Sequence, residues 1–446
     1  MFKMKRACAG IYIIICVLSS HLALAEDVAS DGKGAANSIY SMPLSLLDCY
    51  RLALDQSELI AIDTDRIKET EAHFLQALSV ILPHASFISI DNQQAQSNNA
   101  GTTLAALKPA RSSERKFNVT QTFFNGFKAF AAIKGSRYER KQRIDELARA
   151  QQLLLMDVSD SFYLLTEKLG DYKALSRIRV ALLNRVKELK ARENLGRSRP
   201  SEVVNAKAQL YGVEANLEVV KNQETIARQM LEFLVGRTVY GLTDRYKMPA
   251  ALKKESYYVS KSDSRPDVLA AGYAWEVARR EADVANSDFL PSADFEGNYY
   301  VQRTGFNEGT DWDVKLTVTV PIFEGTETLG NSKAAELKAH ESKLEYQRVK
   351  RRAPYDIKEA YVKLNTALAV HEALRKAYTS AKLNYYLQRK DYERSLVNNL
   401  DVLAAIQMLQ DTERNYIHAV YEAKRLYWQL KVAIGENIAD TLNDTI

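Results

Sequence analysis

The residues that could do bond chemistry follow no catalytic or metal-binding pattern in this chain. His371 and Glu372 begin a stretch, HEALR, that is similar to the start of a zinc-protease helix, but it ends in arginine where the second histidine would stand. The histidines beyond the amino-terminal segment form no close ligand pair: His73, His84, His340, His371 and His418. The sequence also lacks a glycine-rich phosphate loop, a GxSxG motif and a CxxC motif. We therefore expect no enzymatic activity, no metal and no cofactor.

Composition argues against nucleic acid as a partner. The chain has 24 tyrosines interleaved with lysine and arginine, but their helical spacing favours packing between helices. The formal net charge is +5, and it falls to about +2 once three basic residues near the amino terminus are set aside. Charges of both signs are mixed along the chain, which is typical of a solvated helix surface.

The first 25 residues predict export. They combine a basic start, an apolar run and the small-residue pattern Ala23-Leu24-Ala25, so we expect a signal peptide that is cut after Ala25. Of the three cysteines only Cys49 lies beyond this segment, which excludes a disulfide framework within the exported chain.

The elements that would position functional side chains are unusually long helices. No proline occurs between Gly126 and Arg199, and good helix formers fill that stretch. Its apolar residues recur at steps of four and three, as at Leu154 and Val158, which is the coiled-coil period. A helix of about 70 residues is on the order of 100 Å long. The chain then breaks at GRSRPSE, and a second helical run at about 202–234 predicts an antiparallel helical hairpin.

This plan occurs twice. In each half a helix ends at Leu-Pro and is followed by two strand-like segments, a turn containing Phe and Gly, and a very long helix. The hairpin tips align without gaps at an offset of 199 residues, SRPSEVVNAKAQL against VNNLDVLAAIQML. We divide the chain into a signal peptide at 1–25, a linker at 26–45, a first repeat at 46–240, a connecting segment at 241–265, a second repeat at 266–435 and a tail at 436–446.

The strand-like segments alternate apolar and polar residues, and we expect strands at about 83–95, 115–124, 290–302 and 311–321. Side chains in a strand alternate between two faces, so the last segment places five apolar residues on one face: Trp312, Val314, Leu316, Val318 and Val320. The first segment is ambiguous in register. A soluble β-sandwich uses the same alternation, but strands of about ten residues also match those of outer-membrane barrels.

Four such strands cannot close a barrel alone. No stretch beyond the amino-terminal segment offers the 18 or so apolar residues of a membrane-spanning helix, so a membrane crossing would have to use strands. Bacterial barrels start at about eight strands, and open edges cannot face lipid. A dimer would give a tight barrel with no useful lumen, whereas a trimer would give twelve strands. We therefore expect a trimer.

The duplicated order of elements, together with the tip sequences NNLDVLAA and RSRPSEVVNA, resembles the TolC family of outer-membrane efflux and secretion proteins. The resemblance covers about 43–435. It implies a mainly helical fold with membrane strands, in which a homotrimer builds a twelve-stranded barrel in the outer membrane above a twelve-helix tunnel that reaches into the periplasm. It also implies a gate of acidic residues at the periplasmic tips of the helices.

Carried onto this sequence, the resemblance implies gate residues at Asp401, Glu202 and Tyr392. Asp401 in NNLDVLAA matches the first acidic position of the family motif, and Glu202 is its equivalent in the first repeat. The second acidic position holds Ala404, which argues against a double acidic ring. Carboxylates that face one axis repel each other and attract cations, so such a pore should prefer cations. A solvated helix cap is the alternative for Asp401 and, still more, for Glu202.

The resemblance also implies partners. The tips would face a periplasmic adaptor of helical hairpins, through Ser198, Arg199, Ser201, Asn398 and Asn399. The adaptor would be attached to an inner-membrane transporter, either proton-driven or of the ABC type. We expect an exit duct for small molecules, with protein secretion and a periplasmic coiled-coil scaffold as alternatives. Pro354 should kink the second long helix or mark a junction in it.

Overall fold

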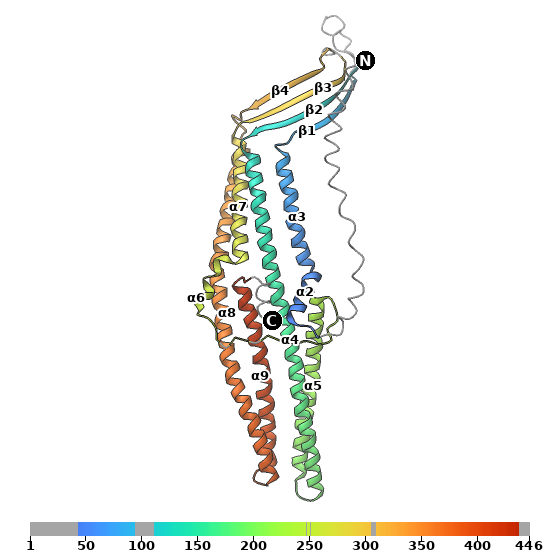
Figure 1. The fold of residues 1–446 in the computed structure, drawn as a ribbon, viewed down its shortest axis with the longest axis vertical. Coiled ribbons are helices and arrows are strands. Elements are labelled where there is room, and N and C mark those ends of the chain that lie inside the picture. Colours follow the sequence, from blue (N-terminus) through green and yellow to red (C-terminus); the bar gives the residue numbers. More distant parts are fainter. Residues whose placement is uncertain (1–42, 94–110, 247, 250, 305–308, 437–446) are drawn as a thin grey trace.

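A computed structural model describes residues 43–93, 111–246, 248–249, 251–304 and 309–436 of the 446-residue chain. The expected signal peptide lies outside these residues, as does all but the first residue of the expected tail. The described part is strongly elongated, with a four-stranded sheet at one end and two helical tips at the other (Figure 1). In these ranges no helix combines the length and the hydrophobicity that crossing a membrane requires.

Two helices of equal length carry the fold. Helix α4 spans Lys128–Asn194 and α8 spans Glu327–Glu393, each with 67 residues, so each is on the order of 100 Å long. Each turns back at its tip into a shorter antiparallel partner, α5 at Pro200–Val235 and α9 at Asn399–Ala433. Apolar side chains three and four residues apart line the hairpins, for example Ile178 and Leu182 on α4 and Val203 and Ala206 on α5, which belong to one buried cluster.

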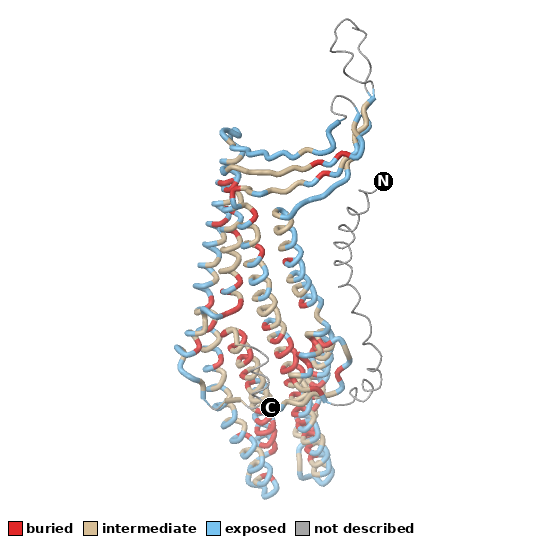
Figure 2. Tube along the Cα trace, turned by 45° about the horizontal axis from the view of Figure 1, so that its top comes forward, coloured by how far each residue is buried: buried red, intermediate tan, exposed pale blue. Residues whose placement is uncertain are grey.

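The upper half has its own helices. Helix α3 (Glu58–Ser79) follows α2 (Leu46–Gln56) and packs on α4, while α7 (Pro266–Asn286) packs on both α4 and α8. A connecting segment with the short helix α6 (Glu255–Val259) and the 3-10 turn η3 (Ser262–Ser264) precedes α7, and the turn η4 (Ser287–Phe289) follows it. Buried residues gather where α2 meets the hairpin of α4 and α5 (Figure 2), around Phe162, Tyr163 and Trp428.

The proline in α8 lies at a junction. The helix is continuous through Pro354, and the end of the connecting segment is fixed beside it, because Arg265 Nη1 donates to the carbonyl of Ala353 at 3.2 Å. Arg265 also pairs with Asp267 and Asp356, so one buried guanidinium ties the start of α7 to the middle of α8.

The sheet is antiparallel with the order β1-β2-β3-β4. Its strands are β1 His84–Gln93, β2 Arg111–Asn125, β3 Ser292–Arg303 and β4 Trp312–Thr319. Strand β2 begins four residues before the sequence-based estimate, because its polar start at 111–115 pairs with β1. The register of β1, ambiguous in the sequence, places Phe87 opposite Phe117. Within the described residues, neither β1 nor β4 has a strand partner on its outer edge.

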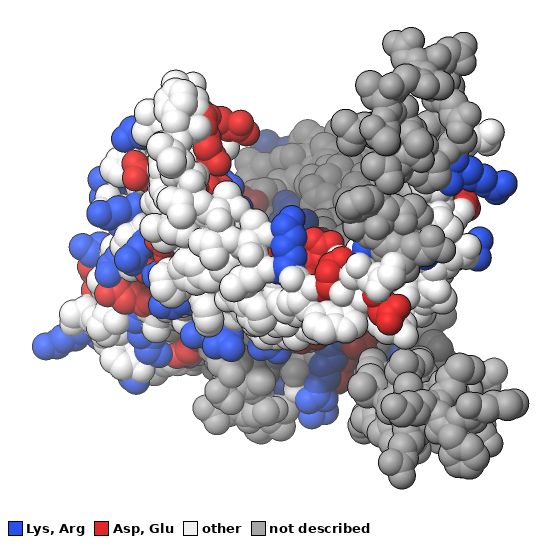
Figure 3. Space-filling view, turned by 90° about the horizontal axis from the view of Figure 1, so that it is seen from above, with Lys and Arg blue, Asp and Glu red and all other residues white. Residues whose placement is uncertain are grey.

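The two faces of the sheet differ in chemistry. One face carries apolar side chains in rows across the strands, such as Phe87, Phe117, Tyr299 and Trp312, and these are exposed in the single chain. The other carries a hydrogen-bonded polar row in which Asn118 donates to Asn298 and Asn298 donates to Asp313. Seen from the sheet end, basic and acidic side chains are interspersed (Figure 3).

Candidate functional site

The two hairpin tips have the same backbone geometry 199 residues apart. Gly196 and Ser395 both adopt a left-handed conformation, with φ of 68° and 59°. In each tip the backbone N–H of the next residue donates a hydrogen bond to a carbonyl of the last helical turn. Arg197 donates to Arg192 at 2.8 Å, and Leu396 donates to Asp391 at 2.9 Å. The duplication expected from the sequence therefore extends to individual hydrogen bonds.

Asp401 lies in the first turn of α9, where it forms a capping box. Its backbone N–H donates to Asn398 Oδ1 at 3.1 Å, and its Oδ2 accepts from the backbone N–H of Asn398 at 3.0 Å. The side chain is exposed. The carboxylate thus has a fixed position at the tip while one of its faces stays open to solvent.

Glu202 has a different environment in the first repeat. Its side chain is half-buried, and its Oε2 accepts a hydrogen bond from Ser198 Oγ at 2.8 Å. The two acidic tip residues are therefore equivalent in the alignment but not in their contacts. Of the tip residues that the family resemblance assigns to docking, Arg199, Ser201 and Asn398 are exposed, and Ser198 is half-buried.

Asn399 differs from the other tip residues because its side chain is buried, with 1% exposed. It accepts a hydrogen bond through Oδ1 from Arg185 Nε at 2.8 Å. This contact joins α9 to α4 across 214 positions of sequence. Asn399 is therefore part of a contact between helices and is not presented at the tip surface of this chain.

Tyr392 lies beside this contact and is 7% exposed. Two guanidinium groups from α4 lie against its ring, with Cζ of Arg185 3.6 Å and Cζ of Arg192 4.5 Å from the ring centroid. Both arginines also pair with Glu188, at 2.9 Å and 3.0 Å. The ring of Tyr392 thus connects the end of α8 to α4 by cation–π contacts. Sequence analysis singled out Tyr392 but missed the arginines, since nothing local marks a contact between segments about 200 residues apart.

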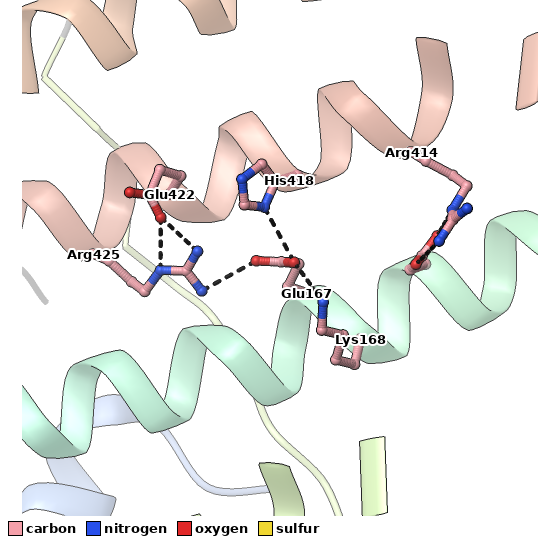
Figure 4. A network of polar contacts seen from close by, with 7 residues as sticks. Glu167, Lys168, Arg414, His418, Glu422 and Arg425 are labelled. Carbon is pink, nitrogen blue, oxygen red and sulfur yellow. Dashed lines mark hydrogen bonds and ion pairs between the residues drawn. The ribbon is translucent and has the colours of Figure 1, made fainter. Parts of the chain in front are cut away.

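Farther from the tips, a network of charged side chains joins α4 to α9 (Figure 4). Glu167 accepts from Lys168 at 3.0 Å and contacts His418 Nδ1 at 3.2 Å, and it pairs with Arg425 Nη1 at 3.1 Å. One turn further along, Asp171 pairs with Arg414 through two contacts of 2.7 Å and 3.0 Å. Sequence analysis gave no indication of this network.

The neighbours of Glu167 set its protonation. Burial alone would raise the pKa of its carboxyl, but the hydrogen bond and charge of Lys168, the charge of Arg425 and the hydrogen bond to His418 together lower it. Glu167 is therefore anionic near neutral pH, and it holds the first repeat to the second through charge.

At the other end of the molecule, the strand residues assigned to lipid form one apolar strip. Trp312, Val314, Leu316 and Val318 alternate along β4 and are exposed in the single chain, and Val320 continues the pattern just beyond the strand. Phe295 and Tyr299 continue this face on β3, opposite Leu316 and Trp312. Such a contiguous exposed apolar surface indicates contact with lipid or with another chain.

Metal binding finds no support in the described ranges, where no three His, Cys, Asp or Glu side chains come together to hold an ion. Cys49 is buried, and burial first, then the charge of Asp48, raises the pKa of its thiol to about 12. It is therefore an unreactive core side chain.

Comparison with known proteins places the chain among outer-membrane proteins. The family model described as "Outer membrane efflux protein" matches residues 259–436. The outer membrane protein TolC of Vibrio cholerae is 22% identical over 320 residues, which are 69% of this chain and 73% of that protein. The alkaline protease secretion protein AprF of Pseudomonas aeruginosa is 24% identical over 175 residues, which cover 38% of this chain and 36% of AprF.

Solved structures share the whole architecture. The outer membrane protein VceC of Vibrio cholerae superposes with a TM-score of 0.77 at 19% identity, covering 88% of this chain and 96% of VceC. The CmeC outer membrane channel of Campylobacter jejuni gives 0.75 at 16% identity, covering 90% of this chain and 89% of CmeC. These likenesses confirm the expected fold class of long helical hairpins below a four-stranded antiparallel sheet.

Proposed function

Because the chain belongs to the outer membrane efflux protein family, typified by TolC, and is a non-enzymatic outer-membrane channel, we propose that three copies form the exit duct of a tripartite efflux system. The duct is passive. It carries small molecules from an inner-membrane transporter and a periplasmic adaptor to the outside of the cell.

The observation that carries this proposal is the pairing of an open sheet with two helical hairpins. Among the described residues, the four strands with one apolar face leave β1 and β4 without a partner on their outer edges. Edges of that kind cannot face lipid, so the sheet must continue into other copies. Three copies give the twelve strands of a barrel wide enough for a lumen, and the helices below then form a tunnel of on the order of 100 Å into the periplasm.

In this proposal the helical tips close the tunnel. Three copies of Asp401 face the axis as one ring, and Ala404 leaves no second ring one turn later. Glu202, half-buried and bonded to Ser198, takes a smaller part. The contacts of Tyr392 with Arg185 and Arg192 hold α8 against α4 and so favour the closed arrangement.

The adaptor docks on the exposed tip residues Arg199, Ser201 and Asn398 and on the half-buried Ser198. The inner-membrane transporter, proton-driven or ABC, selects the cargo. Protein secretion is the second candidate function. One observation favours it: a matched relative, AprF, is named as a secretion protein for alkaline protease.

The test begins with the mass of the full chain after detergent extraction of outer-membrane fractions, measured by light scattering corrected for detergent. We expect three copies per particle. A monomer or dimer would contradict the duct.

Cargo is tested separately in cells that lack the gene. Loss of dye and drug export, restored by the wild-type chain, supports efflux. Loss of one secreted protein with unchanged drug sensitivity would support the secretion alternative.

A further inference from the structure

The turns that join β2 to α4 and β4 to α8 lie between the sheet and the long helices (Figure 1), and they expose large apolar side chains. Six such residues, with exposed fractions from 60% to 95%, form what we call the junction collar: Phe123, Phe127, Phe130, Ile322, Phe323 and Leu329. Phe123 and Ile322 are equivalent at the offset of 199 positions that relates the hairpin tips, as are Phe130 and Leu329. An exposed apolar surface that occurs in both repeats indicates a binding partner.

The collar continues the apolar face of the sheet. The ring centroid of Phe123 lies 5.7 Å from that of Phe295, which belongs to this face. A bulge in β2 beside Phe124 re-aims the side chains at the end of the strand. The ring of Phe124 contacts that of Phe127 at 5.1 Å, and the rings of Phe127 and Phe130 are 6.4 Å apart. Aromatic side chains therefore extend from the sheet to the first turn of α4.

The apolar face of the sheet is too short to span a membrane by itself. Strand β4 has 8 residues. At about 3.3 Å per residue and a tilt of about 45°, such a strand spans about 19 Å along the membrane normal. The apolar band of an outer-membrane barrel is about 25 Å tall, so about 6 Å is missing.

The missing length lies on the helix side of the sheet. On the face that carries Phe87 and Phe117, the residues farther from the helices are polar, since Ser89 lies opposite Arg115 and Asp91 follows. On the helix side, the apolar residues of β4 continue beyond the end of the strand and reach the collar. The collar therefore supplies the part of the band that the strands lack.

Charged side chains next to the collar indicate its depth. Lys128 pairs with Asp288 at 2.8 Å, and Glu324 and Glu327 are exposed in the turn after β4. Charges are costly in the hydrocarbon region of a membrane, whereas aromatic side chains are enriched where hydrocarbon meets water. A collar of apolar side chains interspersed with charges fits that interface.

The backbone of Phe127 supports this placement, because its exposed ring is held in a strained conformation. Its φ is 67°, in the left-handed region that a side chain with a Cβ atom disfavours. The equivalent residue of the second repeat, Thr326, has φ of −108°, so the turn itself does not require a left-handed residue. Strain of this kind gathers at functional positions, where another interaction maintains it.

We propose that the junction collar lies in the lipid–water interface of the membrane leaflet that faces the periplasm, where it contacts lipid headgroups and the adjoining part of the acyl chains. The first turns of α4 and α8, and not the ends of the strands, then mark the membrane boundary. This placement rests on the proposed function, in which the sheet spans the outer membrane.

The first experiment measures the depth of the collar. A cysteine that replaces Phe130 or Phe323 carries a nitroxide spin label, and the full exported chain is reconstituted in vesicles of phosphatidylethanolamine and phosphatidylglycerol. Cys49 is buried, so the label attaches to the new cysteine. Collisions of the label with oxygen and with a water-soluble nickel chelate are compared. We expect both labels at headgroup depth, between Val318→Cys in the hydrocarbon and Leu195→Cys in water at the tip.

The outcomes separate the collar from the duct. Labels at positions 130 and 323 that behave like the one at 195, with the label at 318 in lipid, would overturn the collar and leave the barrel intact. Labels shielded from both reagents would mean that a second copy covers the collar, which also overturns the proposal. A label at 318 in water would contradict the membrane-spanning sheet, and with it the proposed function.

The second experiment uses bilayers of different thickness. A collar at the boundary contributes to the apolar height that the bilayer matches, so the thermal unfolding midpoint should be highest at one acyl-chain length. Phe127→Ser and Phe323→Ser shorten this height, and the maximum should shift to lipids with shorter chains. Phe127→Trp keeps an aromatic ring suited to the interface and should keep the wild-type maximum.

Phe233→Ser is the matched control, because Phe233 is 78% exposed on α5, away from the sheet. It should leave the chain length of the maximum unchanged, whatever its effect on the midpoint. A midpoint that falls equally at every chain length in Phe127→Ser and Phe323→Ser would show that these rings only pack within the protein, and the collar would be rejected.

Discussion

Tyr392 contacts α4 through the face of its ring. Arg185 and Arg192 lie over the ring, and no described residue is hydrogen-bonded to its hydroxyl. We expect Tyr392→Phe to behave like the wild type, because phenylalanine keeps the ring. Tyr392→Leu should lose about 1–2 kcal/mol of contact energy and raise the resting conductance of the pore. Single-channel recording in planar bilayers measures both variants.

Thermal unfolding of the two Tyr392 variants provides the control, since a leak that comes from a misfolded chain would appear as a lowered unfolding midpoint of the whole protein. A rise in conductance for Tyr392→Phe equal to that for Tyr392→Leu would instead assign the closing contact to the hydroxyl.

Asp401 combines a capping role with a proposed pore role, and one substitution separates them. Asp401→Asn keeps an oxygen that can accept from the backbone of Asn398 but removes the charge. If three carboxylates face the axis, the cation preference of the pore should fall, because the field that attracts cations is reduced. The reversal potential under a salt gradient measures this preference.

Asp48→Asn is a matched control for Asp401→Asn, because Asp48 forms the same capping box with Ser45 in α2, far from the tips. It should leave the reversal potential unchanged. A shift of equal size in both variants would mean that the effect comes from helix capping.

At the scale of elements, the seam between α4 and α9 depends on ionised side chains. The pKa of Glu167 is lowered in the folded chain, so its contribution to stability is present above the ordinary pKa of about 4.3 and is lost as pH falls through the lowered value. Glu167→Gln should cost about 1–3 kcal/mol at neutral pH. Its loss of stability below pH 5 should also be shallower than that of the wild type.

Denaturant unfolding at a series of pH values between 7 and 3 measures this difference. Glu336→Gln is the control, since the exposed Glu336 pairs with Lys333 on its own helix. The idea fails if the difference between Glu167→Gln and the wild type is the same at every pH.

Most of the strands and helices could be predicted from the sequence. The strands and hairpins follow from local periodicity, so alternation in WDVKLTVT and steps of three and four on α4 were enough to place them. The start of β2 was missed because 111–115 is polar and owes its strand structure to pairing with β1. The contact of Tyr392 with Arg185 was also missed, because it depends on how two repeats pack and has no local signal.

At the scale of the whole molecule, a surrounding membrane would make the two faces of the sheet differ in their tolerance of a charged side chain. Leu316 and Thr317 are neighbours on β4, point to opposite faces and are both exposed in the single chain. In water an arginine at either position would be tolerated alike. In a lipid-embedded barrel, Leu316→Arg should cost about 2–4 kcal/mol near the bilayer midplane, whereas Thr317→Arg would face the lumen and cost little.

The yield of assembled trimer in the outer membrane, normalised to total protein, measures this difference, and each variant is the other's control. Leu316→Arg should assemble poorly while Thr317→Arg assembles like the wild type, because only the apolar strip meets lipid. The reverse order would mean that the faces are exchanged, with Trp312, Val314 and Leu316 lining the lumen. Equal yields would mean that the apolar strip contacts something other than lipid. A protein partner, and not the membrane, would then have to cover the open edges of the sheet.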